Sequence, residues 1–171
     1  VPVVTAACSS CRVTRNAANG AIRVTLGGAK RTTPGSAFAL LDFGGLGGAS
    51  GVVRVHDRIG LDRGQRLESD LSVLQVTDVD NRIAYRLQVD RSTRLLRLLS
   101  PPGGLSRTGL DISTGTIVPN DGVRTLAVDV AAQAGASIIV RINGRTVVSK
   151  NDLAGGDARK QRYRAVGILN T

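Results

Sequence analysis

The sequence contains very few aromatic residues. Its 171 residues include two Phe and two Tyr, with no Trp and no Met. Proteins that hold single-stranded nucleic acid without base-specific contacts stack the bases on aromatic side chains. A stacking platform of that kind is therefore nearly absent from this chain.

Glutamate and histidine, two residue types of acid–base catalysis, are just as scarce. Glu68 is the single glutamate and lies near Asp70, whereas glycoside hydrolysis uses a pair of carboxylates that flank the scissile bond. His56 is the single histidine, and its neighbour Asp57 would point to the opposite side of a strand. A Ser-His-Asp triad is disfavoured for that reason, and no G-x-S-x-G motif is present.

Two cysteines, Cys8 and Cys11, form the motif CSSC. A structural zinc ion takes four ligands, and His56 is the only other soft ligand in the sequence. A thioredoxin-like site needs a strand–turn–helix context that this segment lacks. We predict a small disulfide loop in an exported segment, with two free thiols as the alternative.

No apolar run approaches the ~20 residues that a membrane-spanning helix needs. The opening VPVVTAA lacks the basic region of a signal peptide. Because the sequence does not begin with Met, we expect a mature or excised part of a longer protein.

The charge is strongly one-sided. The net charge is +10, and 20 of the 23 basic residues are Arg. Such a chain attracts nucleic acid, anionic glycans or acidic surfaces. The arginines are scattered singly, however, and no recognition helix is evident, so nucleic acid is disfavoured as the partner. Scarce Lys and Glu are also typical of a GC-rich bacterial genome.

Apolar and polar residues alternate with period two along most of the chain, which predicts β-strands. Turn-forming groups such as PPGG at 101–104 and Asn143-Gly144 separate them. The expected strands are 21–26, 37–43, 51–59, 71–78, 82–89, 94–100, 124–131, 137–143, 145–149 and 163–169.

Many short strands at this spacing indicate an all-β protein, either a two-sheet sandwich or a barrel. One side of most strands is polar, as expected for antiparallel sheets with one face in water. Residues 1–20 are small and polar, and we predict a linker or a strap along the sandwich edge. Residues 21–171 are predicted to form a single domain.

The order of these elements resembles the laminin-G-like domains of the concanavalin-A-like jelly-roll superfamily. The stretches that carry the resemblance are GVVRVHDRIGLDRG, SVLQVTDVDNRIAYRLQVD, GVRTLAVDVAAQAGASIIVRINGRTVV and YRAVGIL. The resemblance implies two antiparallel sheets, and a concave face or a rim of loops as the binding surface. Sugar-binding relatives usually stack sugars on Trp or Tyr, and the sequence departs from them in this respect.

The resemblance also implies calcium at a rim, with Asp78, Asp80 and Asn81 as weak candidate ligands. Ordinary hairpin-turn chemistry explains the same residues. No other cofactor is indicated.

A polar sheet face is the remaining candidate site. Arg binds carboxylate, sulfate or phosphate groups in bidentate fashion, and we predict that Arg54, Arg86 and Arg141 share the exposed side of one sheet. A solvated face with weak cross-strand pairs is the alternative. The predicted ligand-binding residues are Arg54, His56, Arg86, Gln88, Asp129, Arg141 and Asn143.

The sequence thus predicts a non-catalytic bacterial module, secreted or on the cell surface, that binds a glycan or a protein, with an anionic ligand as one option. A structural or assembly domain of a larger extracellular protein is the alternative. A glycoside-active enzyme comes third.

Overall fold

All the elements that the structure describes are β-strands. The computed structural model describes residues 54–153, apart from 68, 79, 81 and 134, together with the backbone of residue 53 and of five further strands. The strands are β1 (Val3–Ala6), β2 (Arg12–Arg15), β3 (Ile22–Thr25), β4 (Ala37–Asp42), β5 (Val53–Ile59), β6 (Leu71–Asp78), β7 (Ile83–Val89), β8 (Leu95–Ser100), β9 (Leu110–Ile117), β10 (Leu126–Gln133), β11 (Ser137–Ile142), β12 (Arg145–Lys150) and β13 (Tyr163–Asn170). The described residues include no helix that could span a membrane.

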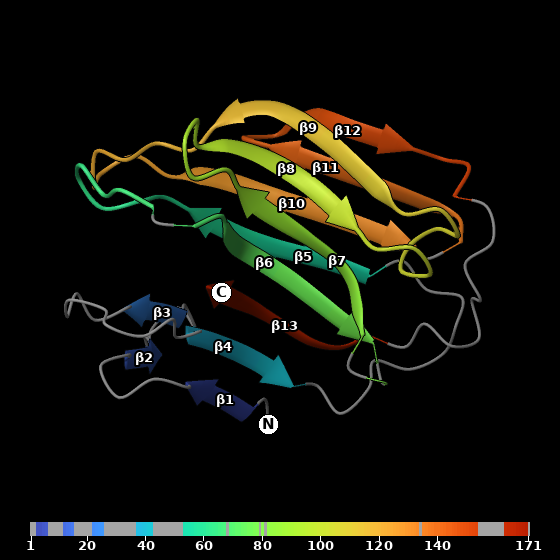
Figure 1. Cartoon of the computed structure of the whole chain (residues 1–171), viewed down its shortest axis with the longest axis horizontal. Coiled ribbons are helices and arrows are strands. Elements are labelled where there is room, and N and C mark those ends of the chain that lie inside the picture. Colours follow the sequence, from blue (N-terminus) through green and yellow to red (C-terminus); the bar gives the residue numbers. More distant parts are fainter. Residues whose placement is uncertain are drawn as a thin grey trace.

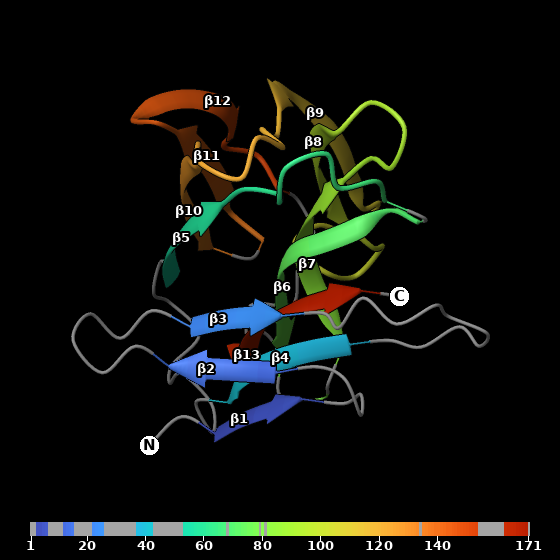
Figure 2. The ribbon, with the colours of Figure 1, turned by 90° about the vertical axis from the view of Figure 1, so that its left-hand side faces the viewer.

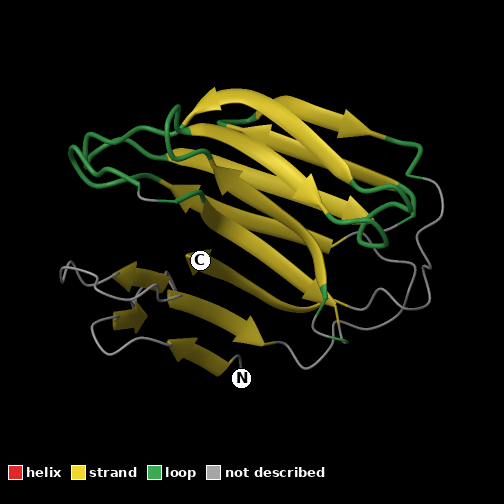
Figure 3. Ribbon diagram, viewed as in Figure 1, coloured by secondary structure: helices red, strands yellow, loops and turns green. Residues whose placement is uncertain are grey.

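Two antiparallel sheets face each other as a sandwich. One has seven strands in the order β1-β4-β13-β6-β7-β8-β9, and the other has four in the order β12-β11-β10-β5. Strands β2 and β3 form a separate pair. Figure 1 shows the two sheets one behind the other, and Figure 2 shows β5, β10, β11 and β12 on one side of the interior with β6 to β9 on the other. Figure 3 shows the described loops joining the ends of the strands.

Alternate residues of the facing strands fill the space between the sheets. Leu87 and Leu98 of the seven-stranded sheet are fully buried, as are Val128 and Val140 of the four-stranded sheet, and all four belong to one hydrophobic core. Burial of each such side chain contributes about 1.5–3 kcal/mol. Because this requirement fixes which residues point inward, it also fixes which residues point to solvent on the other side of each strand.

The ten strands expected from the sequence are all present, with ends that differ by at most two residues. The Asn143-Gly144 turn between β11 and β12 is confirmed as well. Both residues have positive φ, 50° and 79°, as a two-residue hairpin turn of the favoured type requires. The predicted all-β, two-sheet antiparallel sandwich of the jelly-roll class is confirmed.

Three strands were not predicted. Strand β9 has the sequence LDISTGTI, in which Gly115 adopts a φ of +69° and the inward positions pass from Leu110 and Ile112 to Thr114 and Thr116. Strands β1 and β2 fall in the segment expected to be a linker or strap, and β1 is an edge strand of the seven-stranded sheet, paired with β4. The domain boundary at residue 20 remains a prediction.

Two loops hold β5 against β10. The loop after β5 and the loop before β10 are joined by backbone hydrogen bonds from Leu61 N to Pro119 O (2.9 Å), from Gly64 N to Asn120 O (3.0 Å) and from Gly122 N to Leu61 O (3.2 Å). These bonds continue the pairing beyond the strand ends, so the side chains of β5 and β10 keep a fixed register.

Candidate polar site on the four-stranded sheet

The outer face of the four-stranded sheet carries most of the predicted site. Val128 and Val130 of β10 are 1% exposed and point into the core, so Asp129 between them points outward. In the antiparallel register Asp129 lies opposite His56 of β5 on one side and opposite Arg141 of β11 on the other. Four of the seven predicted ligand-binding residues, Arg54, His56, Asp129 and Arg141, therefore share this face.

We call this surface the cationic face and define it by Arg54, His56 and Arg58 of β5, Asp129 of β10 and Arg141 of β11. The three β5 residues are exposed, and Asp129 and Arg141 are half-buried. Ala127 and Ala131 flank Asp129 on β10. Their short side chains leave the centre of the face approachable from solvent.

His56 and Asp129 form a hydrogen bond between Nδ1 and Oδ1 across the two strands. An ionised carboxylate only accepts hydrogen bonds, so the imidazole donates from Nδ1, and Nε2 of the neutral ring is left as an acceptor. The His56 side chain is 74% exposed and that of Asp129 39%. The pair thus offers solvent one nitrogen and one carboxylate oxygen, groups that hydrogen-bond hydroxyls.

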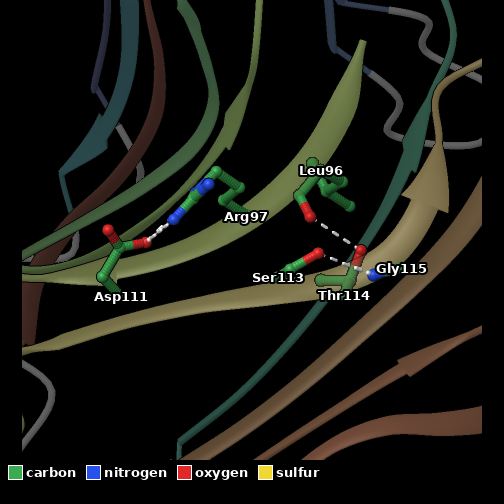
Figure 4. Close-up of polar contacts among 6 residues, drawn as sticks. All are labelled: Leu96, Arg97, Asp111, Ser113, Thr114 and Gly115. Atoms are coloured by element: carbon green, nitrogen blue, oxygen red, sulfur yellow. Dashed lines mark hydrogen bonds and ion pairs between the residues drawn. The ribbon is translucent and has the colours of Figure 1, made fainter. Parts of the chain in front are cut away.

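The arginines of the cationic face have no ion-pair partner among the residues that the structure describes. Arg141 lies directly opposite Asp129, yet the carboxylate bonds His56 instead. Two arginines elsewhere in the described part of the chain are paired with carboxylates. Arg97 donates to Asp111 with its Nε (3.0 Å) and Nη2 (2.6 Å), as Figure 4 shows, and Arg124 pairs with Asp121. Arg54, Arg58 and Arg141 therefore leave their guanidinium groups available to a ligand.

The prediction that Arg54, Arg86 and Arg141 lie on one sheet is wrong. Arg86 and Gln88 belong to β7 in the seven-stranded sheet, where Arg86 lies opposite Gln75 and Leu99. Alternation along a strand tells which side faces solvent, but it does not tell to which sheet the strand belongs. The arginine that shares a sheet face with Arg54 is Arg58 of the same strand. The binding role of all these residues remains a prediction.

Asn143 has a structural use at the edge of the cationic face. Its Oδ1 accepts a hydrogen bond from Ala127 N (2.9 Å), and its own N donates to Ala127 O (2.8 Å). The side-chain oxygen thus extends the pairing of β10 and β11 by one residue. We do not count Asn143 among the groups offered to a ligand.

The carboxylate of Asp78, one of the candidate calcium ligands, takes part in forming the turn. Asp78 Oδ1 accepts hydrogen bonds from Asp80 N (2.9 Å) and Arg82 N (2.8 Å), as hairpin-turn chemistry predicts. Asn81 lies outside the described residues, as do Glu68, Cys8 and Cys11, so the predicted disulfide is untested. Within the described part of the chain, no three His, Cys, Asp or Glu side chains are grouped to hold a metal ion.

Asp57 lies on the other side of β5 from His56, as the sequence predicted, and it points toward the core. Its register partner is Val128, which is 1% exposed. Burial raises the pKa of Asp57 from 3.8 to about 6, and a hydrogen bond from Arg58 N at 2.7 Å offsets only part of this rise. In the sequence, Asp57 stands between Val55 and Ile59 at a position that the alternation of the strand directs inward.

Comparisons with known proteins identify the fold. No family model matches the sequence, and no curated protein matches it. The carbohydrate binding module CBM66 from Bacillus subtilis gives a TM-score of 0.54 at 12% identity, with 97% of this chain and 89% of the module covered. A protein described as a sialidase gives a TM-score of 0.54 at 14% identity over 80% of this chain, which spans only 11% of that protein. At these identities the likeness shows the shared sandwich alone.

Proposed function

We propose that this chain is a non-catalytic, laminin-G-like carbohydrate-binding module of an exported bacterial protein, and that the cationic face binds the glycan. The observation that carries the proposal is the row across three strands in which His56 and Asp129 are hydrogen-bonded and Arg141 lies opposite Asp129. Sugars present many hydroxyls, and the row offers a nitrogen acceptor, a carboxylate oxygen and guanidinium donors within one open surface.

The likeness to a carbohydrate-binding module supports the proposal, because it extends over nearly the whole of both chains. The composition of the cationic face supports the absence of catalysis. Asp129 is the one acid among its described residues, whereas glycoside hydrolysis uses two carboxylates that flank the bond. A secreted or cell-surface location accords with such a role.

His56→Ala is expected to weaken binding of the polysaccharide that the protein retains best by about fivefold, because one hydrogen bond to the ligand is lost. The measurement is isothermal titration or affinity electrophoresis with the protein and a panel of soluble neutral and acidic polysaccharides. An assay for released reducing ends on the same samples should show no turnover.

Gln88→Ala is the matched control, since Gln88 belongs to the seven-stranded sheet and alternates there with the buried Leu87 and Val89. It should change the affinity by less than about twofold, as a surface change away from the site does. Loss of binding in Gln88→Ala but not in His56→Ala would move the site to the other sheet. Failure of every polysaccharide to bind would reject the carbohydrate role in favour of an assembly role.

A further inference from the structure

Three guanidinium groups surround the His56–Asp129 pair on the cationic face. Arg54 and Arg58 are exposed on β5, two residues to either side of His56. Arg141 lies two strands away, in the same cross-strand row as His56. None of the three forms an ion pair with any residue that the structure describes, and the carboxylate of the cationic face, Asp129, is engaged by His56.

The spacing of the three arginines suits a ligand with several separate anionic groups. Arg58 follows Arg54 by four positions along the strand, which places their Cα atoms ~13 Å apart, and two strand spacings place Arg141 ~10 Å from β5. A single small anion would engage one or two of these groups. An extended chain with repeated charges can engage all three while its hydroxyls reach the pair in the centre.

We infer that the ligand of the cationic face is an acidic polysaccharide, whose carboxylate or sulfate groups bind Arg54, Arg58 and Arg141 while its hydroxyls bind His56 and Asp129. This inference rests on the proposed carbohydrate-binding function and names the class of glycan. Guanidinium groups pair with both anions in the same bidentate manner, so the shared chemistry is a repeated oxyanion on a sugar chain.

Asp129 gives the face a preference beyond net charge. A surface that bound any polyanion would gain from having no acid at its centre, whereas this one keeps a carboxylate there and fixes it with a histidine. A carboxylate repels anions but accepts hydrogen bonds from neutral hydroxyls. The ligand is therefore expected to place uncharged, hydroxyl-bearing carbon atoms over Asp129 and its charges over the three arginines.

The test compares the triple variant Arg54→Gln/Arg58→Gln/Arg141→Gln with a control triple of equal charge change, Arg66→Gln/Arg82→Gln/Arg107→Gln. The control residues are exposed and lie outside the cationic face. Affinity is measured for heparin, which carries sulfates, for polygalacturonate, which carries only carboxylates, and for neutral dextran. Thermal unfolding of each variant checks that the fold is intact.

The wild-type protein should bind heparin or polygalacturonate and not dextran, and the preferred one of the two acidic chains identifies the anion. The site triple should lose at least ~30-fold in affinity, from three charge-assisted contacts of modest strength each, and the control triple less than about threefold. Raising the salt from ~0.1 M to ~1 M should abolish binding, because the Debye length falls from ~10 Å to ~3 Å.

Four outcomes would overturn the inference. Equal losses in the two triple variants would show that the +10 charge acts diffusely. Equal affinity for a single-stranded oligodeoxynucleotide would show attraction to any polyanion. If the protein bound dextran regardless of salt, and the site triple bound it equally well, the inference of an anionic ligand would be rejected. The proposed carbohydrate-binding function would still stand. Absence of binding to all three polysaccharides would remove both.

Discussion

Asp57→Asn is expected to stabilise the protein at about pH 8 by as much as about 3 kcal/mol. Asp57 points into the sandwich beside Val128, and burial raises its pKa from 3.8 to about 6. Each unit of pKa corresponds to about 1.4 kcal/mol, so keeping this carboxylate ionised in the folded protein has a cost of that size. The asparagine side chain has nearly the same shape and cannot ionise.

The pH dependence gives this prediction its sign. Below the unfolded pKa of 3.8 the carboxyl is protonated in both states, and the group contributes no pH dependence. Between 3.8 and about 6 the folded state holds the proton and the unfolded state does not, so stability falls as the pH rises. Above about 6 both states are ionised and the destabilisation is complete.

Urea unfolding of the two proteins at about pH 3 and about pH 8 measures the effect. The variant should unfold at a higher midpoint than the parent at the higher pH, and the two midpoints should converge at the lower pH. Asp152→Asn, at an exposed position, makes the same change in net charge and controls for the overall positive charge. A difference between parent and Asp57→Asn that is the same at both pH values would contradict the raised pKa.

The buried charge of Asp57 destabilises the fold, but its position on an edge strand can protect the protein from association. Strand β5 is at the edge of the four-stranded sheet and carries three residues of the cationic face on its other side. An inward-pointing charge on an edge strand discourages pairing with a strand of another molecule. Removal of the charge is therefore expected to gain stability at the expense of this protection.

Strand positions could be predicted from the sequence because the core imposes a period of two. In β10, Leu126, Val128 and Val130 are buried, as their alternation with polar residues predicted. Strand β9 was missed for the opposite reason. It is an edge strand in which the inward Leu110 and Ile112 are followed by two inward threonines and a glycine at positive φ, so its apolar alternation is short.

The centre of the candidate site could not be predicted from the sequence. His56 and Asp129 are 73 positions apart and meet only because β5 pairs with β10. Alternation fixed the outward direction of both residues, but the pairing of strands depends on topology. The same limit placed Arg86 on the wrong sheet. Arg58 shares the parity of Arg54 and His56 along one strand, so the sequence did place it on their face.

Gly104→Ala is expected to destabilise the fold by at least about 3 kcal/mol. A Cβ atom at Gly104 would lie 2.4 Å from Ala84 O and 2.6 Å from Ser100 Oγ. Ser100 Oγ donates to Ala84 O (2.7 Å) and accepts from Leu105 N (2.9 Å), so the added methyl group would displace a buried hydrogen-bonded serine. Leu105 is fully buried and would shift with it, and loss of such bonds and of core packing each costs about 1–3 kcal/mol or more.

Gly103→Ala is the control. A glycine with positive φ is usually the one that tolerates alanine least, and here we expect the opposite order. Gly103 has a φ of +81° but no heavy atom within 4 Å of an added Cβ, so its substitution costs about 1–2 kcal/mol of backbone strain. Gly104 has the ordinary backbone and the crowded site, and should be the more damaging change. Denaturant midpoints of the two variants decide the point. If Gly104→Ala were as stable as Gly103→Ala, the loop between β8 and β9 would be free to move away from Ala84, and the Ser100 hydrogen bonds would not hold it in place.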